Sequence, residues 1–271
     1  MRTLAYRAFV NTRTAFLIFA ITQPIMAAKD LLKAVLPPAA RRWLRRQPLR
    51  FRLLFLRDSF LYRRITPIDP HWGGKRGQVV DRYFIERFLA DHAGDIRGHV
   101  LEFGDDVYAR QFGGKKVDKL DVINLIPAGP NVTIVANLSH ADEIHSNSFD
   151  CIICTQVLLL VYDLRPAIRA LYRILKPGGV LLLTSPGIQK ISRGDMEIGG
   201  DYWRFTTLSM RCLFEEIFPH DLIEVNASGN VLAATASLFG LAVEDIRRED
   251  LDYQDPDFEV SITLRALKPP L

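Results

Sequence analysis

The sequence predicts an α/β fold in which a mostly parallel sheet is covered by helices on both faces. Short apolar runs of strand length recur along residues 99–267. Between them lie stretches whose apolar residues recur at helical spacing. Continuous apolar strands are buried on both faces, and they alternate with helices in doubly wound parallel sheets. These two observations together favour this fold class.

The first predicted element of this region is a helix over residues 79–92. Phe84, Phe88 and Leu89 recur there at helical spacing. Asp81 stands at the start of the run, where a side-chain oxygen can cap free backbone N–H groups. We therefore expect a helix that begins near Asp81 and leads into the first strand.

A glycine-rich stretch, HWGGKRGQ (71–78), precedes this helix. One interpretation is a solvated loop. The other is a lid that brings His71, Arg76 and Tyr83 over a bound ligand, since glycine-rich loops often gate sites.

Strands and helices then alternate to the end of the chain. Strands are expected at 99–103, 117–123, 132–137, 148–156, 180–186, 222–228 and 258–267. Helices are expected at 163–175, 206–218 and 231–246, with a KPGG turn at 176–179. Only 12 residues separate Gly104 from Val117, so the first crossover helix has about two turns at most. The expected result is a Rossmann-like, seven-stranded sheet within residues 65–271.

Residues 1–64 form a predicted basic helical extension. They hold fourteen Lys and Arg against two Asp and Glu, whereas the rest of the chain has an acidic excess. PLRFRLLFLRDSFLYRR (48–64) has the pattern of a basic amphipathic helix. Such a helix suits peripheral contact with an anionic membrane surface, an acidic partner, or packing on the main domain. Nucleic acid is not expected, because no reading motif accompanies the charge.

The first 28 residues leave three interpretations open. Arginines precede the apolar run AFLIFAITQPIMAA, as in a signal peptide or anchor, but the small-residue cleavage pattern is poor. The run is shorter than the roughly 20 residues that a membrane span needs. The other interpretations are a peripheral or packed amphipathic helix and a disordered or partner-bound arm.

The cysteine content indicates a reducing compartment. Cys151, Cys154 and Cys212 are an odd number with no disulfide framework, so we expect a cytoplasmic protein, with membrane association through residues 1–64 as an alternative. Cys151 and Cys154 lie three apart on a predicted strand, so their side chains point to opposite faces. They are interpreted as core residues, and no clustered ligands predict a metal site.

The stretch VLEFGDDVYARQFGG (100–114) marks the expected ligand site. In a doubly wound sheet, ligands bind beyond the carboxyl ends of the strands. A dinucleotide fingerprint would require glycines where Asp106 and Ala109 stand. Carboxylates there would also repel a pyrophosphate, which weakens the alternative of a nicotinamide-dependent reductase.

The same acidic turn favours a cationic nucleoside instead. Glu102, Asp105 and Asp106 can attract the sulfonium and ammonium groups of S-adenosylmethionine (SAM). Asp121 follows Glu102 by 19 residues, near the offset at which an acidic residue binds ribose hydroxyls. Asp118 is a nearby competitor for that role.

The order of these segments resembles a known family. VLEFG, LDVIN, IVANLSHADEIHSNSFDCIICTQVL and LYRILKPGGVLLLTSPG look like the class I SAM-dependent methyltransferases of the methyltransferase type 11 group. The resemblance covers residues 79–267. DYWRFT (201–206) resembles a segment of bacterial members linked to polysaccharide or secondary-metabolite genes. In this family the last strand is antiparallel and inserted into the sheet.

The resemblance implies a set of cofactor-binding residues. Glu102 and Gly104 would lie against the methionine part of SAM, with Asp105 beside them. Asp121 would hold the ribose, and Val122 would flank the adenine. Of the family's glycine-rich motif, only the first glycine is kept.

Three further positions follow from the resemblance. Asn137 and Leu138 match the tip of the third strand, next to the adenine ring, although the family usually has Asp where Asn137 stands. Gln156 matches the position that lines the methyl-transfer site.

DYWRFT is expected in the acceptor pocket. Tyr202 can stack on a sugar or aromatic ring, and Arg204 can bind a carboxylate or phosphate. Alternatively, the aromatic residues of this segment only cap the core. His140 and His145 follow the third strand, and His140 is a candidate general base.

The sequence therefore predicts a bacterial SAM-dependent methyltransferase that methylates oxygen on a small molecule or a saccharide. The alternative is a catalytically degenerate binding or scaffold protein that keeps the fold.

Overall fold

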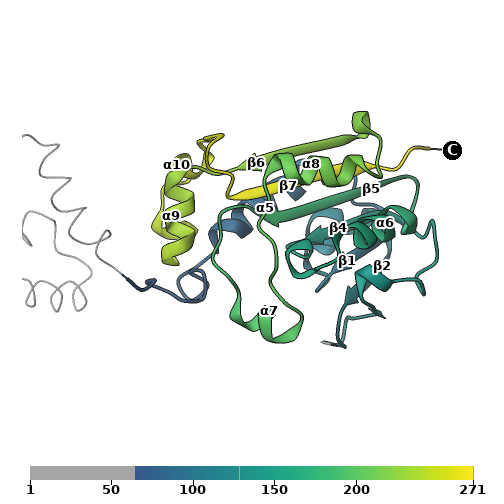
Figure 1. The fold of residues 1–271 in the computed structure, drawn as a ribbon, viewed down its shortest axis with the longest axis horizontal. Helices are drawn as coiled ribbons and strands as arrows, with labels where there is room; N and C mark the ends of the chain where they lie inside the picture. Colours follow the sequence, from purple (N-terminus) through teal and green to yellow (C-terminus); the bar gives the residue numbers. More distant parts are fainter. Residues whose placement is uncertain (1–64, 128, 271) are drawn as a thin grey trace, which may run out of the picture. The chain divides into compact units, whose positions relative to one another are not determined.

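The sheet of the computed structural model, which describes residues 65–127 and 129–270, has seven strands in the order β3-β2-β1-β4-β5-β7-β6 (Figure 1). The strands are β1 Gly98–Phe103, β2 Val117–Asn124, β3 Ile134–Val135, β4 Phe149–Thr155, β5 Leu175–Pro186, β6 Ile223–Ser228 and β7 Ser261–Leu267. Every pairing is parallel except those of β7, which runs antiparallel between β5 and β6. The predicted Rossmann-like fold and its antiparallel last strand are confirmed.

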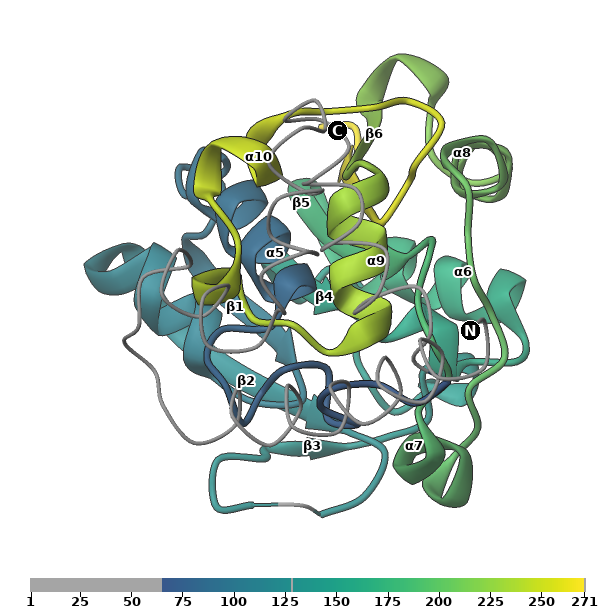
Figure 2. The ribbon, with the colours of Figure 1, turned by 90° about the vertical axis from the view of Figure 1, so that its left-hand side faces the viewer.

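Helices cover both faces of this sheet (Figure 2). The helices of the described residues are α5 Val80–Asp91, α6 Leu164–Ile174, α7 Arg193–Ile198, α8 Thr207–Glu215, α9 Val231–Phe239 and α10 Arg248–Asp252, of which α7 buries no residue. No helix among the described residues combines the length and the apolar character needed to cross a bilayer. The predicted extension at 1–64 lies outside the described residues, and Thr66–Leu271 form one compact unit.

Side chains of β4 alternate between two apolar layers. Cys154 packs in the layer that contains Ile168 of α6 and Phe214 of α8. Cys151 packs in the opposite layer, with Leu89 of α5. Burial raises the pKa of both thiols, which keeps them protonated and unreactive. The two cysteines face opposite sides of the sheet as predicted.

The crossover from β1 to β2 is as short as expected. A π-helical turn at Ala109–Gly113 and a 3-10 turn at Gly114–Lys116 replace a full helix. A Cβ at Gly113 would lie 2.5 Å from the side chain of Val117 and 2.7 Å from that of Ile96. A glycine is therefore needed for this close packing.

Several predicted boundaries are wrong; the strand expected at 132–137, for example, is only Ile134–Val135. The helix expected at 231–246 ends at Phe239, because Gly240 adopts a φ of +69° and a Cβ there would meet a backbone oxygen. The KPGG segment is not a separate turn but part of β5, where the register with β4 shifts. The cap of α5 is Val79, which offers no capping side chain, and Asp81 lies inside the first turn.

Candidate active site

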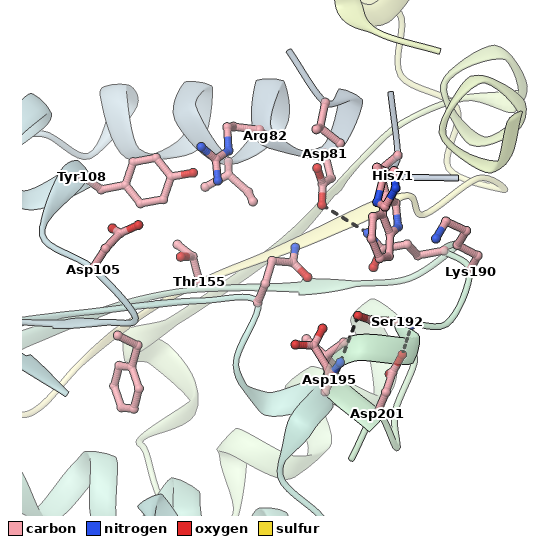
Figure 3. A pocket seen from close by; sticks show the side chains of 17 residues that line it. His71, Asp81, Arg82, Asp105, Tyr108, Thr155, Lys190, Ser192, Asp195 and Asp201 are labelled. Atoms are coloured by element: carbon pink, nitrogen blue, oxygen red, sulfur yellow. Dashed lines mark hydrogen bonds between the residues drawn. The ribbon is translucent and has the colours of Figure 1, made fainter. Parts of the chain in front are cut away.

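Two cavities meet at the carboxyl ends of β1 and β4. We call the first, of about 360 Å³, the charged cavity; its polar lining includes Asp81, Arg82, Asp105, Tyr108, Gln189, Lys190 and Asp195 (Figure 3). We call the second, of about 520 Å³, the apolar cavity; its lining includes Gly104, Ile123, Asn124, Leu125, Ile126, Asn137, Leu138 and Tyr202. Phe103, Thr155, Gln156 and Asp195 line both. The cleft is therefore continuous across the edge of the sheet where ligands bind in doubly wound folds.

The turn after β1 combines a buried carboxylate with an open glycine. Glu102 is fully buried and accepts hydrogen bonds from the backbone N–H groups of Tyr108 (3.0 Å) and Ala109 (2.7 Å). Burial raises the pKa of Glu102 to about 7, against the effect of these two bonds. Gly104 has a φ of +91°, and a Cβ there would meet nothing within 4 Å. Glu102 thus shapes the loop from behind, while Gly104 leaves room for a ligand in the apolar cavity.

The acidic side chains predicted to cluster in this turn have different surroundings in the structure. Asp105 lines the charged cavity, and its carboxylate accepts the N–H of Val107 at 3.1 Å. Asp106 pairs instead with Arg110 at 2.6 Å and lines neither cavity. Asp105 is the member of the cluster that can face a cationic ligand.

Asp121 and Val122 are not brought to the cleft. Asp121 binds His99 (2.7 Å) and Thr133 (2.9 Å) within the sheet. Burial opposes ionisation of Asp121, but hydrogen bonds from its neighbours outweigh it and lower the pKa. Val122 is buried. The strand ends at Asn124, which does line the apolar cavity.

The structure places Asn137 and Leu138 in the apolar cavity, as the resemblance implied. The Asn137 side chain accepts the N–H of Ser139 at 3.0 Å and so caps a short 3-10 turn. Leu138 is only 4% exposed and supplies an apolar wall. Leu125, which follows β2, lines the same cavity.

Gln156 occupies the junction of the two cavities. Its φ is +56°, a conformation that is rare and strained for a residue with a side chain. Both amide atoms of its side chain are buried and have no hydrogen-bond partner among the described residues. Such an unsatisfied amide is costly unless a ligand or water completes it. Gln156 therefore combines a strained backbone with an amide that has free hydrogen-bonding capacity at the junction of the cavities.

DYWRFT holds the loop that precedes it. Arg204 binds the fully buried carboxylate of Asp201 (2.5 Å) and donates to the carbonyl oxygens of Gln189 (3.1 Å) and Lys190 (2.7 Å). Asp201 also accepts the N–H of Ser192 at 2.7 Å (Figure 3). Arg204 lines neither cavity, so the structure gives it no contact with an acceptor. Arg204 and Asp201 therefore tether the preceding loop, residues 189–192, which borders the charged cavity.

Tyr202 and the histidines lie in different places. Tyr202 lines the apolar cavity, where it is 48% exposed, and His140 lines the same cavity. His71 lines the charged cavity, whereas His145 lines neither. Of the three residues suggested for a lid, only His71 lines a cavity. Arg76 and Tyr83 bind carboxylates elsewhere.

Sequence reasoning missed Asp81 and Asn124 as cleft residues. Asp81 was read as a helix cap, and only the fold shows that the first turn of α5 borders the charged cavity. Asn124 could have been found, because it directly follows the apolar end of β2.

The cleft fits SAM in two chemical respects. The apolar cavity can enclose adenine, and Asn124 at the strand end offers an amide to ribose hydroxyls. The charged cavity carries carboxylates, including Asp105 and Asp81, that suit a sulfonium and an ammonium. The unsatisfied amide of Gln156 lies where the two parts of such a ligand would join.

Comparison with known proteins agrees with this assignment. Residues 113–183 match the profile of a methyltransferase domain family, a match that begins after Glu102 and Gly104. The comparison with curated proteins finds no match. The chain has the fold of a class I SAM-dependent methyltransferase, and the family match indicates SAM as the cofactor.

The solved structures that align with this chain are distant in sequence. A SAM-dependent methyltransferase from Archaeoglobus fulgidus aligns at 10% identity with a TM-score of 0.47, over 69% of this chain and 94% of that one. A SAM-dependent methyltransferase from Mesorhizobium loti aligns at 17% identity with a TM-score of 0.45, over 66% and 95%. The N-methyltransferase NodS from Bradyrhizobium japonicum aligns at 15% identity with a TM-score of 0.43, over 70% and 97%.

Proposed function

We propose that the protein transfers a methyl group from SAM to an oxygen atom of a small molecule or a saccharide. The observation that carries the proposal is the continuous cleft, whose apolar and charged cavities meet at Gln156. The apolar cavity matches an adenosine, and the charged cavity matches a cationic methionine part with space beside it for an acceptor. SAM supplies an electrophilic methyl group when bound.

The chain's own residues hold and orient the reactants. Glu102 fixes the loop after β1 through two backbone N–H groups, and Gly104 gives the cofactor room. Asn124 can bind ribose hydroxyls, and Asp105 offsets positive charge. Methyl transfer from a sulfonium requires mainly alignment, and positioning can supply up to about 7–11 kcal/mol of the barrier.

The acceptor space lies in the part of the charged cavity away from Asp105. Lys190 and His71 line this part and offer polar groups to a hydroxylated compound (Figure 3), and Gln189, which donates to Asp81, lines the same cavity. The second acceptor candidate from the sequence, Tyr202, lies in the apolar cavity and would contact only a ligand that extends there.

Two measurements test the proposal. Isothermal titration calorimetry should show binding of SAM and of its demethylated product, S-adenosylhomocysteine (SAH). Transfer of a radiolabelled methyl group to a panel of sugars, alcohols and phenols should then give at least one labelled product that depends on the protein. Binding of neither SAM nor SAH would contradict the proposal and favour the alternative of a catalytically degenerate binding or scaffold protein. Binding without transfer to any hydroxyl compound, but with transfer to amines, would contradict the assignment to oxygen.

A further inference from the structure

Asp81 is a carboxylate inside the charged cavity. It lies in the first turn of α5, and its side chain points into the cavity between Tyr108 and His71 (Figure 3). Its carboxylate accepts one side-chain hydrogen bond, from Gln189 Nε2 at 3.2 Å. Among the described residues no cation forms an ion pair with it, unlike Asp201 in the same cavity, which Arg204 binds.

The surroundings of Asp81 make it a stronger base than an ordinary aspartate. Burial raises the pKa of Asp81. The backbone N–H and the positive charge of the neighbouring Arg82 lower it, but burial has the larger effect. The other titratable or charged groups that face the cavity come from the loop before α5, the turn after β1, the segment after β5 and α7: His71, Asp105, Tyr108, Lys190, Asp195 and Asp201.

Other carboxylates of the site are less suited to receive a proton. Glu102 is buried, but its oxygens are occupied by two backbone N–H groups and it lines neither cavity. Asp105 is exposed and its carboxylate already accepts the N–H of Val107, whereas Asp195 borders both cavities and faces the adenosine side as well. Tyr202 and His140 lie in the apolar cavity, which the adenosine occupies under the proposed function.

We propose that Asp81 is the general base that removes the proton of an acceptor hydroxyl, and that Gln189 positions it. The inference rests on the proposed function and narrows its substrate class to hydroxyl groups that are protonated in solution, such as those of alcohols and sugars. The acceptor oxygen gives its proton to the Asp81 carboxylate and bonds to the methyl carbon. The carbon–sulfur bond breaks and leaves its electron pair on sulfur. The products are a methyl ether, SAH and protonated Asp81, which returns its proton to solvent.

The first test is the pH dependence of transfer to a hydroxyl acceptor found with the panel. The ionised carboxylate is the active form, so the wild-type rate rises with pH through the raised pKa of Asp81. Asp81→Asn should lower kcat by about 100-fold or more and remove this acidic limb, while KM for SAM changes by less than about threefold. Asp91→Asn, an identical change at the exposed end of the same helix, should behave as the wild type.

The second test needs no acceptor. A bound sulfonium lowers the pKa of a nearby carboxylate, so SAM binding at mildly acidic pH should release protons, and SAH binding should release fewer. Calorimetry in buffers of different ionisation enthalpy measures this release. It should decrease in Asp81→Asn, where only groups such as Glu102 can still contribute, and stay at the wild-type value in Asp91→Asn.

The outcomes separate the two proposals. Proton release that is undiminished in Asp81→Asn, or an Asp81→Asn variant that keeps both kcat and the acidic limb, would overturn the role of Asp81 while SAM binding upheld the proposed function. A protein that binds neither SAM nor SAH would overturn both.

Discussion

The apolar and charged cavities are built from different parts of the chain. The apolar cavity is made at strand ends, by residues such as Gly104, which follows β1, Asn124, which ends β2, and Leu138, which lies shortly after β3. The charged cavity draws instead on α5 and on the loop after β5, which contribute Asp81 and Lys190. The cofactor's apolar end is thus placed by the sheet itself, whereas the groups that meet the acceptor come from elements that pack over the sheet.

The largest effect is expected when the loop over the cleft is released. Arg204→Met should lower the free energy of unfolding by about 3–5 kcal/mol, because it leaves the buried Asp201 carboxylate without its cation. Denaturant unfolding measures the loss. Arg211→Met is the matched control, since Arg211 and Glu215 form a partly exposed pair at 3.4 Å that is worth about 1 kcal/mol or less. Equal losses of unfolding free energy in the two variants would show that Arg204 of DYWRFT does not hold this loop in place.

The next effect concerns the turn from which the apolar cavity opens. Gly104→Val should weaken SAM and SAH binding by about 100-fold or more, because a branched side chain would enter the cavity and strain a φ of +91°. Calorimetry gives both affinities. Gly94→Val, at an exposed glycine with open space around it, should leave them unchanged. Unchanged binding in Gly104→Val would place the cofactor elsewhere.

Substitutions at two exposed residues, one in each cavity, compare how the cavities contribute to SAM and SAH affinity. Leu125→Asp should weaken SAM and SAH about equally, by about tenfold, because both ligands carry the adenine that the apolar cavity encloses. Asp105→Asn should weaken SAM about three- to fivefold more than SAH, because only SAM carries the sulfonium charge. If Leu125→Asp changed the ratio of the two affinities and Asp105→Asn did not, the assignment of the cavities would be reversed.

The smallest effect distinguishes two neighbours on β2. Asp121→Asn should change SAM affinity by less than about twofold, because Asp121 is bound to His99 and Thr133 away from the cleft. Asn124→Ala should weaken it by about fivefold through the loss of ribose contacts. Equilibrium dialysis with radiolabelled SAM is sensitive enough for both. A larger loss in Asp121→Asn would restore the ribose role that the sequence suggested.

The fold and the strand-end residues could be predicted because each depends on local pattern. Apolar runs located the strands, and Gly104, Leu138 and Gln156 follow the ends of those runs. The offset from Glu102 predicts Asp121 for the ribose, whereas the structure ends β2 at Asn124 and leaves Asp121 outside the lining of both cavities.

The rest of the site depends on contacts that are distant in the sequence. Asp81 faces the cavity because α5 packs over the sheet, and Gln189 reaches it from 108 residues away. The sequence predicts Arg204 as a ligand-binding arginine, whereas in the structure it donates to carbonyl oxygens of the preceding loop. No pattern of residues on a single element encodes either arrangement.

The most direct measurement of the central claim is a crystal structure of the protein with SAH. The expected result is an adenine between Leu125 and Leu138, a ribose beside Asn124, and an amino-acid end that passes Gln156 toward Asp105. Density for SAH outside the cleft, or an adenine in the charged cavity, would contradict the account.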